Sequence, residues 1–424
     1  MLKRSLGYII ILSLAVLSAC SSDGSDENSS AGDKSMEIFG AEEWTQYRMG
    51  PDKNAVIDSG HEPLEHMRLA TEEEVRATPV VADGKVFIGN HDSGEIMAFD
   101  LEDGSKIWET HAPNWIHSEA IYHEGKVYVG YGNRDFNEDG TRGTGESGVM
   151  ALDAETGETV WEFNTEGAVM PTPAIYGDHL YAATGGRHLY KLTLDEGTPE
   201  HKYDLGSVVT MSSPSIYEDT LYVGGGRPDP QTFYAYDLQE DDIKWKKEFP
   251  DVAMGLDDVP PAAADGIILT TALVYNEDGE SEHEIYAMDT ETGEIVWKDN
   301  WGTGKPVENN KSGAPMIHDG KVFVASPKTE TYYAYDLKTG EQLWAVKGTA
   351  AKAPPVAQDG IVYFANEEGV VTGIDIERGE KVKEKELGGT LSPAGPVIAN
   401  DTLFVGSRDS YVYVVPLSDF EDVQ

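Results

Sequence analysis

From Ala77 onward, short apolar runs alternate with polar turns, and the whole pattern repeats along the chain. The first unit reads ATPVVADGKVFIG, then a variable loop, then EIMAFDLEDGSKIWET. Its apolar runs span 79–82, 85–89, 95–101 and 106–109, and the turns DG and EDGS separate the first pair and the last pair. Short alternating runs bounded by such turns are typical of antiparallel strands. Each unit therefore predicts a four-stranded sheet.

The unit occurs eight times. Aligned on one proline position, successive units lie 41, 53, 41, 47, 54, 40 and 41 residues apart. The aligned positions are Pro79, Ala120, Pro173, Pro214, Pro261, Pro315, Pro355 and Pro396. A repeat of about 40 residues that holds four strands is one blade of a propeller. The sequence therefore predicts an all-β, eight-bladed β-propeller.

The two ends of the chain are expected to meet. The last unit supplies only three strands, so we expect HMRLA, residues 66–70, to add the missing outer strand from upstream of the first unit. This pairing would close the ring and protect its edges. Residues 44–424 would then form one domain, because each blade packs only on its neighbours.

The first residues predict export and a lipid anchor. MLKR is positively charged, residues 6–19 are mainly apolar, and LSAC ends at Cys20. The apolar run is too short to span a bilayer and predicts a signal peptide over 1–19. LSAC resembles the bacterial lipobox, which implies cleavage before Cys20 and lipid on its thiol; an ordinary secretory signal is the alternative. Residues 20–43 are small, polar and acidic and predict a flexible tether.

The charge excludes some partners. With 32 Lys and Arg against 76 Asp and Glu, the formal net charge is −44, which repels nucleic acid and anionic headgroups. Hydrophobic residues make up 39%, enough for a core, so the acidity coats a folded surface and is typical of a protein from a salt-loving organism. Once Cys20 carries lipid, no thiol remains for a disulfide, a cysteine–zinc site or a nucleophile. We expect a monomer.

A finer signature runs through the third and fourth strands of most units and reads Ala-x-Asp-x(3)-Gly-x(3)-Trp, or close to it. Unit three has His201 and unit seven has Lys383 in place of the tryptophan. The signature tryptophans are Trp108, Trp161, Trp245, Trp297 and Trp344. We expect them to dock each blade on the next, since a buried indole contributes a large apolar area and seeks one hydrogen bond. The signature resembles the pyrroloquinoline-quinone-type (PQQ-like) propeller repeat.

Two branches of that family have different implications. Quinoprotein dehydrogenases bind the quinone over calcium beside two adjacent cysteines, and this chain has one cysteine, so the resemblance gives no basis for a quinone cofactor. The chain also resembles the lipid-anchored propellers of the outer-membrane barrel-assembly machinery, the BamB family, in lipobox, tether, blade number and length. That resemblance implies a protein-binding scaffold without enzymatic activity.

The same resemblance implies a place outside the cytoplasm, on the periplasmic side of an outer membrane or, in a cell with one membrane, on its outer face. The alternative function is a quinone- or sugar-binding protein, or a propeller enzyme, that works at the channel mouth. No Ser-His-Asp order, HExxH or phosphate loop is present, so the sequence names no catalytic residue. Asp257 and Asp258 are adjacent on a strand-like segment and should point apart, so we do not expect them to act together.

Insertions fall between the second and third strands or between units, and both kinds of link emerge on one side of a propeller. Loops held on a rigid scaffold are where binding usually lies. Candidates for partner binding are Trp115 and His117, for which a packed plug between blades is the alternative. Trp301, Lys305 and Lys311 lie in a loop without acidic excess, for which a solvated loop is the alternative.

The insertion in the second unit, DFNEDGTRGTGE at 135–146, matches the spacing of a calcium loop. Its oxygen ligands would be Asp135, Asn137, Asp139, Thr141 and Glu146. Arg142 departs from the pattern and the flanks are predicted strands, so the loop resembles the DxDxDG calcium loops found between propeller strands. We predict calcium here, with an acidic loop in solvent as the alternative. NEDGESEHE at 276–284 lacks the first acid and predicts only a turn.

Overall fold

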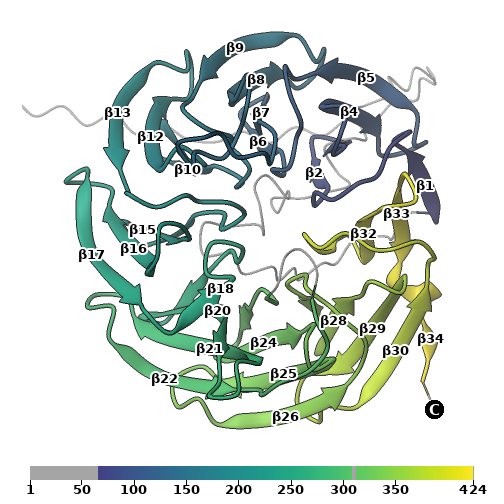
Figure 1. Cartoon of the computed structure of the whole chain (residues 1–424). Helices are drawn as coiled ribbons and strands as arrows, with labels where there is room; N and C mark the ends of the chain where they lie inside the picture. Colours follow the sequence, from purple (N-terminus) through teal and green to yellow (C-terminus); the bar gives the residue numbers. More distant parts are fainter. Residues whose placement is uncertain (1–64, 308–311, 424) are drawn as a thin grey trace, which may run out of the picture. The chain divides into compact units, whose positions relative to one another are not determined.

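The computed structural model describes residues 65–307 and 312–423. The chain divides into two units, Met1–Lys34 and Ser35–Gln424, and every described residue belongs to the second. In this part of the chain, eight antiparallel sheets follow one another around a ring (Figure 1). The predicted all-β, eight-bladed propeller is confirmed.

The signal peptide, Cys20 and the tether lie outside the described residues, and the predictions about them stay predictions. Among the described residues, no helix is long and apolar enough to cross a membrane.

Seven blades run outward from a three-residue inner strand that follows the aligned proline position. The strands are, for blade one, β2 (Val80–Ala82), β3 (Lys85–Gly89), β4 (Glu95–Asp100) and β5 (Lys106–His111); for blade two, β6 (Ile121–His123), β7 (Lys126–Tyr131), β8 (Gly148–Asp153) and β9 (Thr159–Asn164); for blade three, β10 (Ala174–Tyr176), β11 (His179–Ala183), β12 (His188–Thr193) and β13 (Pro199–Asp204); and for blade four, β14 (Ser215–Tyr217), β15 (Thr220–Gly225), β16 (Gln231–Asp237) and β17 (Asp242–Phe249). The strands of the next three blades are, for blade five, β19 (Ala262–Ala264), β20 (Ile267–Tyr275), β21 (Ser281–Asp289) and β22 (Ile295–Asn300); for blade six, β23 (Met316–His318), β24 (Lys321–Ser326), β25 (Thr331–Asp336) and β26 (Gln342–Lys347); and for blade seven, β27 (Val356–Gln358), β28 (Ile361–Ala365), β29 (Val370–Asp375) and β30 (Lys381–Glu386).

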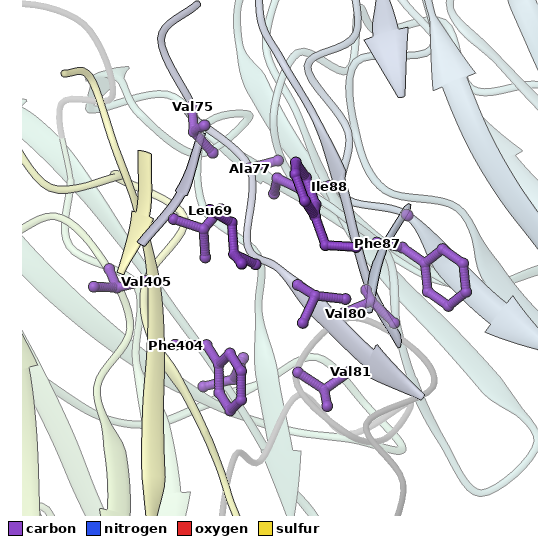
Figure 2. Close-up of a cluster of buried hydrophobic side chains, with 14 of the residues drawn as sticks. Leu69, Val75, Ala77, Val80, Val81, Phe87, Ile88, Phe404 and Val405 are labelled. Atoms are coloured by element: carbon purple, nitrogen blue, oxygen red, sulfur yellow. The ribbon is translucent and has the colours of Figure 1, made fainter. Parts of the chain in front are cut away.

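Blade eight closes the ring. It contains β31 (Val397–Ala399), β32 (Thr402–Ser407) and β33 (Tyr411–Pro416), and β1 (Met67–Ala70) supplies its outer strand. The predicted pairing of 66–70 is confirmed, with β1 antiparallel to β33. Figure 2 shows apolar side chains from both ends of the ring, such as Leu69 and Phe404, gathered in one buried cluster. This burial holds the first and last blades together by the hydrophobic effect.

Two strands were not predicted. β18 (Val252–Met254) lies in the link between the fourth and fifth units, where no strand was expected, and it pairs with the far end of the nine-residue β20. β34 (Glu421–Asp422), after the short helix η1 (Leu417–Asp419), pairs with the outer strand of blade seven. Strands of two or three residues are too short to carry an alternating pattern, and they form because a longer strand offers them an edge.

The signature tryptophans lie at the blade boundaries. Trp161 is 8% exposed, and its indole N–H donates to the Leu194 carbonyl of blade three at 2.9 Å. The small Ala151 lies directly opposite it in the sheet. Gly197 of blade three packs under the ring, where a Cβ would lie 2.4 Å from Trp161 Cε3. The other four tryptophans make the same donation to the next blade, Trp108 to Ala154, Trp245 to Thr290, Trp297 to Leu337 and Trp344 to Ile376.

Candidate functional site

A cavity of about 250 Å³ lies at the centre of the ring. Each blade contributes the residue that stands three positions before its aligned proline position, at the end of the link that enters the innermost strand. These eight residues, which we call the mouth ring, are Arg76, His117, Met170, Met211, Asp258, Ser312, Lys352 and Pro393. The repeat itself therefore brings together side chains that lie up to 317 residues apart in the sequence, from 76 to 393.

The blade-two insertion adds two arginines to this cavity. Arg134 and Arg142 both line it, although the sequence suggested the insertion only as a calcium loop. Arg142 is held through its backbone, because its N–H donates to the Gly185 carbonyl at 3.0 Å and its carbonyl accepts from the Ala168 N–H at 2.8 Å. Both partners belong to blade three, so the insertion is fixed across a blade boundary.

Glycine permits this close approach. Gly143 has φ 107°, and a Cβ there would lie 2.4 Å from the Ala168 nitrogen. A residue with a side chain would have to shift the backbone that fixes Arg142. The packing of this loop against blade three therefore fixes the Arg142 backbone beside the cavity.

The charge of the cavity opposes that of the chain. Its lining includes four cationic side chains, Arg76, Arg134, Arg142 and Lys352, and two carboxylates, Glu119 and Asp258. Over the whole chain, acidic residues outnumber basic ones by 76 to 32. Cations thus outnumber carboxylates in the lining, whereas the reverse holds for the whole chain, so the potential in the cavity is more favourable to anions than the potential at the rest of the acidic surface.

Two of the four cations are already neutralised. Arg76 pairs with Glu74 at 2.7 Å, and Lys352 pairs with Glu367 at 2.8 Å. Arg134 and Arg142 form no ion pair with any residue that the structure describes. Burial lowers the pKa of Arg142 from its ordinary value, and the nearby carboxylates of Asp258 and Asp257 act against this shift. The guanidinium stays charged at neutral pH and has hydrogen-bond donors to offer.

The expectation that Asp257 and Asp258 point apart is wrong. The two residues lie in a turn after β18, not in a strand, and both carboxylates approach the Thr210 hydroxyl. Turn geometry removes the alternation that separates neighbouring side chains in a strand. Burial and the charge of Asp258 raise the pKa of Asp257 above its ordinary value. The pair lies at one side of the cavity, which Asp258 lines.

His117 lines the cavity, and Trp115 lies next to His117. The His117 ring contacts His91 edge-on with centroids 4.1 Å apart, and Trp115 lies 5.9 Å from His117. The Arg134 guanidinium lies 5.9 Å from the Trp115 ring centroid, within the range of a cation–π contact. Burial lowers the pKa of His117 well below its ordinary value, with His91 and Arg142 adding to the shift. His117 is therefore a neutral imidazole at pH 7.

In the second group of partner candidates, Trp301 and Lys305 both contact residues of blade six. Trp301 stacks on Tyr333 at 4.7 Å and donates its indole N–H to the Tyr335 hydroxyl at 2.6 Å. Lys305 pairs with Glu330 at 2.5 Å and lines a second hollow next to the cavity. Lys311 lies outside the described residues. Trp301 thus has a packing role, and Lys305 is available only together with its carboxylate partner.

The predicted calcium ligands form an exposed turn. The Thr141 N–H donates to the side-chain oxygens of Asn137 and Asp139, at 2.9 and 2.8 Å. The bond to Thr141 lowers the pKa of Asp139. The carboxylates of Asp135, Asp139 and Glu146 do not converge within 4.8 Å in the described structure. Calcium binding here would need these side chains to turn inward, and it stays a prediction.

The fold and the cavity define a class of protein, a repeat propeller of PQQ-like type with a basic central cavity. A family model described as outer membrane protein assembly factor BamB matches residues 40–142, 141–251 and 281–419. The chain belongs to this family of PQQ-like β-propeller repeat proteins.

The individual relatives include proteins named as an enzyme and proteins named as an assembly factor. Tetrathionate hydrolase from Acidithiobacillus ferrooxidans is 29% identical over 366 residues, which cover 80% of this chain and 72% of that protein. The outer membrane protein assembly factor BamB of Yersinia pestis is 21% identical over 336 residues, 76% of this chain and 79% of that protein. The crystal structure of BamB from Moraxella catarrhalis has a TM-score of 0.62 at 18% identity and covers 83% of this chain and 98% of that chain, which shows the shared fold.

Proposed function

We propose that this protein binds a small oxyanion in its central cavity. The observation that supports this function is the presence of Arg134 and Arg142, two arginines without a carboxylate partner among the described residues, in the cavity of a chain with net charge −44. A guanidinium presents a planar set of donors that matches the oxygens of such an anion. Arg76 and Lys352 add positive charge from the mouth ring.

The insertion supports the same function. A partly buried guanidinium without a counter-ion is costly, so a loop that fixes Arg142 at a cavity by two backbone hydrogen bonds implies a ligand that compensates the charge. The rest of the surface is acidic and would repel anions, so anion binding would be confined to the cavity.

Tetrathionate is the first anion to test, because a relative that is 29% identical over 80% of this chain is named tetrathionate hydrolase. It carries two negative charges on sulfonate-type ends, which fit the arginine-rich lining. Whether the chain also cleaves the anion is measured in the same samples as loss of tetrathionate with time. Binding without loss defines a binding protein, and loss defines a hydrolase.

Isothermal titration of the wild type with tetrathionate, at constant ionic strength, tests the binding. We expect saturable binding at one site and a loss of affinity of about tenfold to a hundredfold in Arg142→Gln, since a hydrogen bond to a charged group contributes about 1.5–3 kcal/mol. Arg378→Gln is the matched control, because Arg378 is exposed and pairs with Asp375 on the outside of blade seven. Absence of binding by the wild type, or equal loss in both variants, contradicts the proposal.

A protein-binding scaffold in outer-membrane protein assembly is the second candidate. The match of the family model over most of the chain supports it. It does not depend on the arginines of the cavity, so a wild type that binds no anion would favour the scaffold. For either function we propose that the protein lies outside the cytoplasm, tethered by lipid on Cys20.

A further inference from the structure

A single hydroxyl faces three oxygens beside the central cavity. Thr210 Oγ1 lies 2.8 Å from Asp257 Oδ2, 3.0 Å from Asp258 Oδ1 and 2.9 Å from the Asp257 carbonyl oxygen. The carbonyl already accepts from the Met211 and Ser212 N–H groups, each at 2.8 Å. The two carboxylates are therefore the groups that compete for the Thr210 hydrogen.

One hydrogen cannot satisfy both carboxylates. A threonine hydroxyl donates once and otherwise accepts, whereas an ionised carboxylate only accepts. If Thr210 donates to one carboxylate, its contact with the other becomes attractive only when that second group carries a proton and donates it to Thr210. The geometry thus indicates one proton on the Asp257–Asp258 pair.

The surroundings of the pair are mixed in charge. The Asp257 carboxylate packs against Gly226, where a Cβ would lie 2.5 Å from Oδ2, so no side chain solvates it from that side. In the segment 210–213, the described hydrogen bonds to the two carboxylates come from the Thr210 hydroxyl. Arg227, which follows Gly226, is exposed. The charged or titratable groups that line the cavity opposite or beside the pair are Arg142 and Arg134 of the insertion, Glu119, and His117, Arg76 and Lys352 of the mouth ring.

We propose that Asp257 and Asp258 share one proton at the edge of the anion site and that anion binding in the cavity is coupled to proton binding by this pair. The inference rests on the proposed function, because it concerns the same cavity. Asp258 lines that cavity together with Arg142, so a bound anion approaches both. An anion beside two ionised carboxylates would be repelled, and a proton on the pair removes one negative charge and supplies a donor.

The sign of the coupling follows from linkage. Burial and the neighbouring carboxylate already raise the pKa of Asp257 in the free protein. A bound anion raises the pKa of the pair further, so binding takes up protons, and affinity rises as the pH falls. For a single coupled proton the affinity changes at most about tenfold per pH unit. His117, whose pKa is lowered, would give an effect of the same sign and must be separated from the pair.

Titration calorimetry between pH 6 and 8 measures the coupling directly. The wild type is titrated with tetrathionate, which does not itself titrate in this range, in two buffers of different ionisation enthalpy that are not oxyanions. The difference in heat gives the number of protons taken up. We expect uptake of up to one proton and a parallel fall in affinity with rising pH, of at most about tenfold per unit.

Three variants assign the proton. Asp257→Asn keeps the shape but cannot titrate, and we expect it to bind tetrathionate without proton uptake and with little pH dependence. His117→Gln should retain the uptake, as should Asp251→Asn, in which an exposed residue away from the cavity is changed. Thermal unfolding checks that each variant is folded.

The outcomes separate this inference from the proposed function. Wild-type binding without proton uptake overturns the coupling and leaves the anion site standing. Uptake that disappears in His117→Gln and persists in Asp257→Asn assigns the proton to the histidine and also overturns it. If the wild type binds no tetrathionate at any pH, the proposed function itself fails.

Discussion

At the scale of single residues, five of the blade boundaries contain a pair formed by a tryptophan and a glycine of the next blade. Gly197 has φ 64°, a left-handed conformation, and it packs against the face of Trp161. The indole N–H is satisfied by the Leu194 carbonyl of the same turn. The signature Ala-x-Asp-x(3)-Gly-x(3)-Trp therefore codes for both sides of a blade boundary, with the glycine serving the tryptophan of the preceding blade.

Gly197→Ala should destabilise the propeller by about 2–4 kcal/mol, because a Cβ costs about 1–2 kcal/mol in the left-handed conformation and overpacks the indole by a similar amount. Gly177→Ala is the matched control. Gly177 has φ 55° in the same blade, and a Cβ there meets nothing within 4 Å. Chemical unfolding should show the larger loss for Gly197→Ala. Equal losses would show that the contact with Trp161 contributes nothing beyond the backbone conformation.

The cavity residues show how far the sequence could be read at this scale. The alignment on Pro79, Ala120 and their equivalents already placed one residue per blade at the same position, three before the proline. Reading that column gives the whole mouth ring, yet the residues share no chemical type, so no motif marks them. Arg142 was visible only as a departure from a calcium pattern. The convergence of Asp257 and Asp258 depends on a turn whose local sequence looks like a strand.

At the scale of the element, the blade-two insertion has two parts, a tip that is predicted to bind calcium and a base that positions Arg142 at the cavity. Its tip is an exposed turn in which Asn137 and Asp139 accept from Thr141, and its base fixes Arg142 on blade three. The oxygen-rich tip and the arginines are separate parts of one loop. Calcium at the tip would stiffen the loop and so help to position the arginines, but the backbone bonds to blade three already do so.

Calcium binding can be tested at the tip alone. If the predicted site forms, titration calorimetry detects one calcium ion per chain, and Asp139→Ala abolishes it by removing a ligand. Asp278→Ala is the matched control, because Asp278 stands at the corresponding place of the NEDG turn in blade five, where the Asn276 side chain accepts from the backbone in the same way. No calcium binding, or binding that survives Asp139→Ala, leaves the tip as an acidic loop in solvent.

At the scale of the whole molecule, the repeat pattern was sufficient for the architecture. The period, four alternating runs per unit and a missing last strand predicted eight blades and the closure by residues 66–70, and both are observed. The edge strands β18 and β34 were missed because pairing with a neighbour, not local pattern, creates them. The expected origin in a salt-loving organism stays a prediction that rests on composition.

The contrast between surface and centre is the property of the whole propeller that bears most on function. The chain carries 44 excess negative charges, while its eight blades and one insertion place four cationic side chains around a cavity of about 250 Å³. No single blade contains this site. It arises because the ring closes and brings the mouth ring together, so the anion site depends on the intact fold.

Anomalous diffraction from crystals grown with selenate, a divalent oxyanion, tests the anion site most directly. Data collected at the selenium absorption edge locate the anion without assumptions about its contacts. The account predicts an anomalous peak in the central cavity within hydrogen-bond distance of the Arg142 guanidinium, and its absence in Arg142→Gln crystals grown in the same way. Selenate bound only on the outer surface, with an empty cavity in the wild type, would contradict it.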